Sequence, residues 1–144
     1  MDPWPRETRH AVMAKVRGKN TKPEIAVRRL LFALGYRYRL HRTDLPGKPD
    51  LVFPGRRKVV FVHGCFWHAH DCPRGARPKS NEAFWDEKLR RNQERDLRYL
   101  AMLSDMGWDV CVIWECELRD VAAVQTKLQR FLGDPHLLRQ PKAA

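Results

Sequence analysis

The 144-residue sequence has no long apolar run, no internal repeat and no low-complexity tract. Without an uninterrupted apolar stretch of about 18 residues, the sequence offers no candidate for a membrane-spanning helix. Residues 1–7 carry charges where a secretion signal has an apolar segment, so we expect an intracellular, cytoplasmic protein. The hydrophobic content of 43% is too high for a disordered chain and predicts one domain with its own core.

Acidic residues are in deficit. The chain has 28 Lys and Arg against 17 Asp and Glu, which gives a formal net charge of +11. A charge of this size on a small domain favours a polyanionic partner such as nucleic acid, although a merely soluble basic protein is the alternative. The basic residues cluster at positions 17–22, 28–29, 56–58 and 88–91. This clustering supports nucleic acid as the partner without distinguishing DNA from RNA.

Cysteine and histidine are also scarce, with four and six residues, but five of these ten lie within residues 63–72. They are His63, Cys65, His68, His70 and Cys72. Imidazole and thiolate are the preferred ligands of zinc, and four of them close a tetrahedral site. Two disulfides are the alternative use of four cysteines, but an intracellular chain rarely forms them. The stretch therefore favours a metal site.

The first predicted helix of the central part of the chain begins at Thr21 and ends at Gly35. Thr21 and Glu24 have the spacing of a capping box, and glycine is typical after a helix end. Glu24 also lies on the same helical stripe as Val27 and Leu31, so we expect its side chain to face inward. A capping role and a functional role for Glu24 are compatible.

Two further helices are predicted, a long one over residues 82–106 and a last one from Asp120 to Gly133. Near the C-terminal end of the long helix, three residues are expected on the buried side: Leu97, Leu100 and Ala101. Strands are predicted over residues 36–40, 50–53, 58–63 and 109–115. This order of elements predicts an α/β domain with a central mixed sheet flanked by helices.

Asp50 follows a Gly-Lys-Pro turn and begins a predicted strand. A carboxylate at this place can hold a divalent cation, and magnesium commonly binds through one or two carboxylates. The alternative is an ordinary Pro-Asp turn. The arrangement resembles the Pro-Asp…(Asp/Glu)-x-Lys core of nucleases, but residues 59–63 of the next strand contain no acid. The candidates for the missing functions are His63, His68 and Glu24.

Three stretches resemble the very short patch repair (Vsr) mismatch endonucleases: PGKPDLVF at 46–53, HGCFWH at 63–68 and WECELR at 114–119. The similarity covers roughly residues 6 to 132, and the HGCFWH string is highly specific. The resemblance implies a restriction-endonuclease-like core and a nick 5′ to the thymine of a T·G mismatch. Such mismatches arise when 5-methylcytosine deaminates. It also implies catalytic magnesium, two ions in all, and one structural zinc.

For the active site, the resemblance implies that Asp50 binds magnesium directly, together with the backbone carbonyl of Val62. Glu24 and His63 would bind metal-coordinated water, and His68 would activate the attacking water. A neutral imidazole can accept a proton near pH 7, which agrees with that role. Two cations would stabilise the attacking and leaving oxygens of an in-line displacement. The alternative for His68 is a histidine without a catalytic role.

The resemblance also implies a set of zinc ligands: Cys65, His70, Cys72 and Cys116. Three of them come from one loop, and the fourth comes from the end of a strand far along the chain. Such a site would pin the loop to the sheet. Cys111 falls in the middle of a predicted strand, where we expect a small buried apolar residue.

For DNA, the resemblance implies an aromatic wedge that intercalates beside the mismatch: Phe66, Trp67 and Trp85. Unstacking costs on the order of a few kcal/mol per step, and less at a weakened pair. Met13 would approach from the other groove. Base-edge contacts are implied for Lys88, Asn92 and Arg119. The alternatives are core packing for the aromatic residues, and phosphate contacts or a solvated face for the three polar ones.

We therefore expect one mismatch endonuclease domain over residues 1–144, with residues 1–20 as a DNA-contacting arm and 134–144 as a flexible tail. The expected protein is a monomer acting on double-stranded DNA in the bacterial nucleoid, with mismatch-repair accessory proteins as candidate partners. One rival is a related nickase with a different sequence context. The other is a zinc-stabilised DNA-binding module without cleavage, which would have no use for Asp50 and His68.

Overall fold

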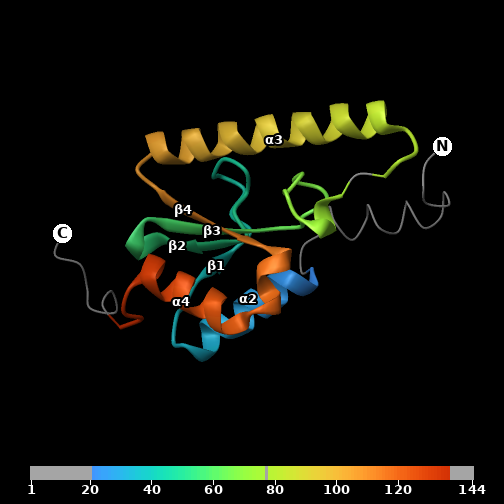
Figure 1. The fold of residues 1–144 in the computed structure, drawn as a ribbon. Coiled ribbons are helices and arrows are strands. Elements are labelled where there is room, and N and C mark those ends of the chain that lie inside the picture. The colour runs from blue at the N-terminus through green and yellow to red at the C-terminus, as the bar shows by residue number, and fades with distance from the viewer. Residues whose placement is uncertain (1–20, 77, 137–144) are drawn as a thin grey trace.

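The computed structural model describes residues 21–76 and 78–136 (Figure 1). The helices are α2 (Lys22–Ala33), α3 (Glu82–Asp105) and α4 (Val121–Leu132), and the strands are β1 (Arg39–Leu40), β2 (Leu51–Phe53), β3 (Lys58–His63) and β4 (Asp109–Trp114). Short 3-10 helices follow β2, the Cys/His loop and β4, at Pro54–Arg56, Pro73–Gly75 and Glu115–Arg119. The predicted arm over 1–20 and residues 137–144 of the predicted tail lie outside the described residues. Among the helices of the described part, none has the length and apolar character to span a membrane.

The four strands form one mixed sheet in the order β1-β2-β3-β4. The first three strands are antiparallel neighbours, whereas β3 and β4 run parallel and pair His63 with Trp114 at their ends. Helices α2 and α4 cover one face of the sheet and α3 covers the other (Figure 1). The predicted α/β domain with a central mixed sheet is confirmed.

Alternating side chains of β3 build two apolar cores, one on each face of the sheet. Val60 packs with Leu31 of α2 and Leu128 of α4. Val59 and Phe61 point to the other face and belong to the core that contains Leu103 of α3 and Trp108. Because β3 is covered on both faces, most of its side chains are buried, including the last one, His63.

The N-cap predicted at Thr21, which starts α2, is confirmed. The side chain of Thr21 accepts a hydrogen bond from the backbone N–H of Glu24 at 3.4 Å. Glu24 is only 2% exposed and shares its face of the helix with the fully buried Val27 and Leu31. The inward orientation expected for Glu24 is therefore correct.

Two expectations for the elements were wrong in detail. The strand expected over 36–40 is limited to Arg39–Leu40, because Tyr36 and Tyr38 turn into the core and pack edge-on against Phe53. On α3, Leu97 is 67% exposed and Ala101 is also exposed, whereas Leu100 is half-buried.

The inward stripe of α3 runs instead through two apolar and two polar residues before it reaches Leu103 near the helix end. The four are Trp85, Leu89, Asn92 and Asp96, which recur every three or four residues. The polar pair faces the loop after β3 rather than the sheet. Leu97 lies one residue beyond Asp96, and a helix turns by about 100° per residue, so Leu97 points away.

The outer strand β4 is flanked by a lysine from α4. The ammonium group of Lys127 donates to the backbone carbonyl of Val112 at 2.9 Å and lies 3.0 Å from the carboxylate of Glu117. The last helix is thus fastened to the sheet by polar contacts as well as by its apolar face.

Candidate active site and metal centres

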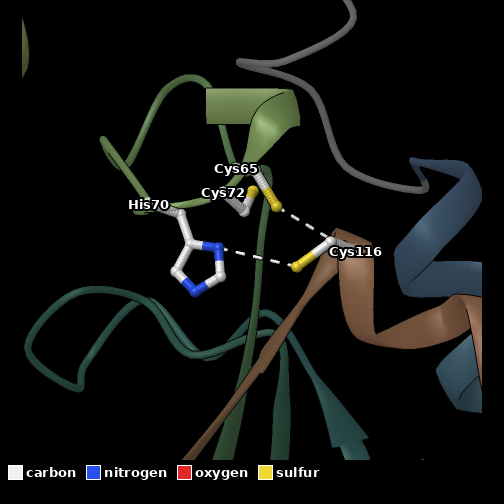
Figure 2. Close-up of side chains that lie close together, drawn as sticks. All are labelled: Cys65, His70, Cys72 and Cys116. Atoms are coloured by element: carbon white, nitrogen blue, oxygen red, sulfur yellow. Dashed lines mark hydrogen bonds between the residues drawn. The ribbon is translucent and has the colours of Figure 1, made fainter. Parts of the chain in front are cut away.

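Four predicted ligands converge where the loop after β3 meets the turn after β4 (Figure 2). Their ligand atoms all lie within 4.8 Å of one another, and they are Cys65, His70, Cys72 and Cys116. The sulfur of Cys116 lies 3.5 Å from Nδ1 of His70, and its backbone N–H donates to the sulfur of Cys65 at 3.4 Å. All four cysteines are free, so the alternative of two disulfides is wrong.

The loop is folded tightly enough to hold these ligands in place. The backbone N–H of His70 donates to the carbonyl of Cys65 at 2.9 Å, and that of Cys72 donates to the carbonyl of His70 at 2.9 Å. Gly75 returns so close that a Cβ atom there would lie 2.0 Å from the His70 carbonyl oxygen. Only glycine fits at position 75, where the backbone after Cys72 turns back against the backbone of His70.

The chemistry of this cluster fits a soft or borderline cation. Burial, together with the neighbouring thiols of Cys116 and Cys72, raises the pKa of the Cys65 thiol to about 12. Ionising several neighbouring thiols at once is unfavourable unless a cation is present to balance their charges. Three thiolates and one imidazole are the donor set of many structural metal sites. Cys111 is buried in β4, as expected for a small apolar residue.

A second cluster lies where β2 begins. The ligand atoms of Glu24, His41 and Asp50 lie within 4.8 Å of one another. Oδ2 of Asp50 accepts a hydrogen bond from the backbone N–H of Val62 at 2.7 Å, which ties this carboxylate to β3. Predicted magnesium-site residues Asp50, Glu24 and Val62 are thus brought together.

The electrostatics of this cluster favour a cation. Burial raises the pKa of Asp50 to about 7; the Val62 N–H opposes this shift, and the nearby Glu24 carboxylate adds to it. Glu24 is itself held from two sides, with Nη2 of Arg28 and Nε2 of His41 each 2.5 Å from one of its oxygens. Two buried carboxylates side by side suit a hard divalent ion with oxygen ligands.

His41 was not foreseen. It sits just beyond the short strand β1 in a left-handed conformation, with φ of 50°, and this turn brings its ring back toward α2. Its backbone N–H donates to the carbonyl of Asp50 at 3.4 Å. The sequence contains no local signal for this approach, because it depends on the pairing of β1 with β2.

A third cluster contains the two remaining predicted catalytic residues, His63 and His68, with Asp96 of α3. The rings of His63 and His68 stack face to face, with centroids 3.7 Å apart and planes 1° from parallel. Nδ1 of His68 lies 2.6 Å from Oδ2 of Asp96. Asp96 was also not predicted. If the inward face of α3 had been assigned through Leu89 and Asn92, Asp96 would have stood out as the acidic residue on that face.

This arrangement prepares His68 to accept a proton. Burial acts to raise the pKa of Asp96, but the hydrogen bond with His68 and the nearby charges of His68, His63 and Arg95 together outweigh burial, so the pKa is lowered overall. When Asp96 accepts the Nδ1–H of His68, Nε2 carries the lone pair of the ring and is the nitrogen that can accept a proton. Burial, and then the neighbouring His68, lowers the pKa of His63 to about 3, so His63 is neutral.

The predicted wedge residues form one aromatic group. Phe66 and Trp67 are half-buried in the loop and contact each other edge-on at 5.0 Å, and each contacts Trp85 edge-on at 5.3 and 6.0 Å. Trp85 is only 1% exposed, so it supports the two loop rings, and its own insertion into DNA would require rearrangement. Phe84 is 55% exposed beside it and was not foreseen.

The residues expected to touch base edges are spread around this group. Nδ2 of Asn92 donates to the backbone carbonyl of Trp67 at 2.9 Å, so in this structure it supports the loop. Lys88 is half-buried one turn before it, and Arg119 is exposed at the end of the 3-10 helix after β4. Met13 lies outside the described residues. Their DNA contacts stay predictions.

Comparisons with known proteins agree with the motifs. Residues 1–74 match the family model for the DNA mismatch endonuclease Vsr. The chain is 54% identical to the type II nicking enzyme V.XorIIP of Xanthomonas oryzae pv. oryzae, over 90% of this chain and 94% of that protein. It is 45% identical to the type II nicking enzyme V.NmeAIP of Neisseria meningitidis, over 88% of this chain and 90% of that protein.

The DNA mismatch endonuclease Vsr of Escherichia coli is 40% identical, over 78% of this chain and 72% of that protein. A nuclease of this kind acts on DNA and uses divalent metal, which agrees with the carboxylate cluster, the histidine pair and the net charge of +11. The chain belongs to the Vsr family of DNA mismatch endonucleases.

Proposed function

We propose that this endonuclease nicks one strand of duplex DNA 5′ to the thymine of a T·G mismatch, with magnesium as its catalytic cation. The observation that supports it most is the pair of clusters at the end of β3. Asp50 is bonded to the backbone of Val62, and the next residue, His63, stacks on His68. A cation site and a proton acceptor therefore lie on either side of one strand end.

Asp50 would hold the cation directly, with the Val62 backbone beside it, and Glu24 would hold it through a coordinated water. When bound, the cation supplies positive charge that stabilises the charge developing on the phosphate oxygens. Arg28 and His41 hold the Glu24 carboxylate in place. Val62 orients Asp50 through its N–H, so neither carboxylate has to reorganise when DNA arrives.

His68 would take the proton from the attacking water at Nε2. The resulting imidazolium is stabilised by Asp96 through Nδ1–H, in the manner of a histidine–aspartate pair. His63 contributes a neutral ring that limits rotation of His68. The basic surface would draw the duplex in, and the loop rings Phe66 and Trp67 would insert where the stack is weakest.

The test of this function is a nicking assay with magnesium on matched duplexes and on duplexes that carry each mismatch. Nicking confined to T·G duplexes and to the thymine strand is the expected result. Duplexes that differ in the bases flanking the mismatch test the alternative of a related nickase with a different sequence context. The names of two relatives, both nicking enzymes, agree with that alternative as well. Binding without any cleavage would instead indicate a DNA-binding module.

We also propose that the Cys3His cluster holds one structural zinc. Purified protein should then contain about one zinc per chain by elemental analysis, because four ligands fill a tetrahedral site. Cys116→Ser is expected to lose zinc and solubility, since it removes the ligand that links the turn after β4 to the loop. Cys111→Ser is the matched control and should keep both. Well-folded protein without zinc would contradict the proposal.

Truncation of the wedge is expected to affect mismatch selectivity. Trp67→Ala should weaken binding to T·G duplexes more than binding to matched duplexes, because wedge contacts form only where the stack opens. Binding of the wild type and the variant to both duplexes is compared at one salt concentration, since phosphate contacts weaken together as salt rises. An equal loss on both duplexes would assign Trp67 to packing or general affinity.

A further inference from the structure

The indole of Trp114 lies between the zinc cluster and the active-site histidines. On one side it stacks on the ring of His70, a proposed zinc ligand, with centroids 4.1 Å apart and planes 14° from parallel. On the other side it meets the ring of His63 edge-on, with centroids 5.1 Å apart and planes at 73°. A continuous series of ring contacts therefore runs from His70 through Trp114 and His63 to His68.

The backbone holds Trp114 firmly in this position. It is the last residue of β4 and pairs in register with His63, the last residue of β3. Its backbone N–H donates to Oε1 of Glu117 at 3.0 Å, and Cys116 follows two residues later in the zinc cluster. The indole is thus fixed by the sheet before it and by the metal-binding turn after it.

His63 depends on such packing for its orientation. Its Nδ1 is buried and has no hydrogen-bond partner among the described residues. Its ring is bounded by Phe61 at 5.4 Å, by His68 at 3.7 Å and by Trp114 at 5.1 Å. If the indole were removed, one side of this enclosure would open, and His63 could no longer hold the face of His68.

We propose that Trp114 is a positioning residue that aligns the His63–His68 pair with the zinc-anchored loop. The inference rests on the proposed function of His68. His68 lies in the loop between the zinc ligands Cys65 and His70, so the zinc cluster sets the path of the loop. Trp114 transmits that position to the strand end where the chemistry takes place, and the zinc cluster thereby acts on the reaction as well as on stability.

The experiment compares Trp114→Leu and Trp114→Phe with the matched control Trp108→Leu. Trp108 is also a buried indole, but it precedes β4 at the other end of the strand and lies against the guanidinium of Arg57. Four quantities are measured: zinc content, affinity for the T·G duplex, the single-turnover nicking rate at saturating DNA, and the NMR signals of the histidine ring C–H groups.

Trp114→Leu is expected to keep its zinc and its DNA affinity but to nick about 10- to 100-fold more slowly, since a displacement of about 1 Å can cost about 100-fold. Trp114→Phe should recover most of the rate, because a ring still fills the space. The C–H signals of His63 and His68 should move in both Trp114 variants, since the indole ring current is lost. Trp108→Leu should change neither the signals nor the rate at saturating DNA.

A full nicking rate in zinc-loaded Trp114→Leu would overturn the proposal, as would an equal loss of rate in Trp108→Leu. If Trp114→Leu fails to fold, the nicking rate of Trp114→Phe decides: a rate below that of the wild type at full zinc content and DNA affinity supports the proposal, and a wild-type rate overturns it. A wild-type protein that binds zinc but does not nick would refute the proposed function instead, and the histidine signals would still report the position of Trp114.

Discussion

Asp50→Asn is expected to abolish magnesium-dependent nicking while binding to the mismatched duplex survives. The amide is nearly the same size as the carboxylate and can still accept the Val62 N–H, so the fold of the site is retained. It lacks the charge that a hard cation requires. Charge stabilisation by a metal ion contributes several kcal/mol, so the single-turnover rate should fall by at least about 10³-fold.

The matched control is Asp44→Asn, which removes an exposed acid paired with Arg42 in the preceding turn and should leave the rate unchanged. Magnesium affinity is measured in parallel by calorimetry, and it should fall for Asp50→Asn alone. A variant at position 50 that nicks at a rate near that of the wild type would remove Asp50 from the cation site.

His68→Ala is expected to slow nicking by about 10²- to 10⁴-fold, the usual range for the loss of a general base. DNA affinity and zinc content should be retained, because His68 is not among the four clustered residues that we propose hold zinc. The single-turnover rate is measured at saturating DNA and magnesium, so that binding does not enter. An unchanged rate would leave His68 as a histidine without a catalytic role.

The pairing of His68 with Asp96 adds a sharper test. Asp96→Asn removes the charge that holds Nδ1–H and stabilises the imidazolium, so it should also lower the rate. If Asp96 acts through His68, the double variant should be no slower than His68→Ala alone, because groups that act as a unit are not additive. Independent, additive losses would show that Asp96 works elsewhere.

Features defined by neighbouring residues could be predicted from the sequence. Thr21 and Glu24 specify the start of α2 through one local hydrogen bond, and Asp120 starts α4 by accepting the backbone N–H of Ala123 at 3.1 Å. Lys58–His63 is apolar enough to be recognised as a buried strand. The dense Cys/His stretch after it indicated a metal site, and the family resemblance selected Cys65, His70 and Cys72 within it and supplied Cys116.

Features that depend on how distant segments meet could not be predicted in this way. His41 reaches Glu24 only because a left-handed turn follows a two-residue strand. Asp96 reaches His68 because the inward stripe of α3 turns polar over the loop. The spacing of apolar residues predicted a buried Leu97 instead. That pattern contains no information that this part of the helix covers a polar site rather than the apolar core. For Trp85 the sequence left an exposed wedge and core packing both open, and the structure shows a buried ring.

The contact of Lys127 with the β4 backbone has a consequence for how the protein behaves at high concentration. An outer strand with free carbonyl and N–H groups is a template for pairing with a strand of another molecule. At Val112 the carbonyl is already bonded to an ammonium group, which an incoming strand would have to displace. At the opposite edge, β1 offers two residues, too few to pair securely. Both margins of the sheet in the described residues therefore disfavour the addition of a strand from another molecule.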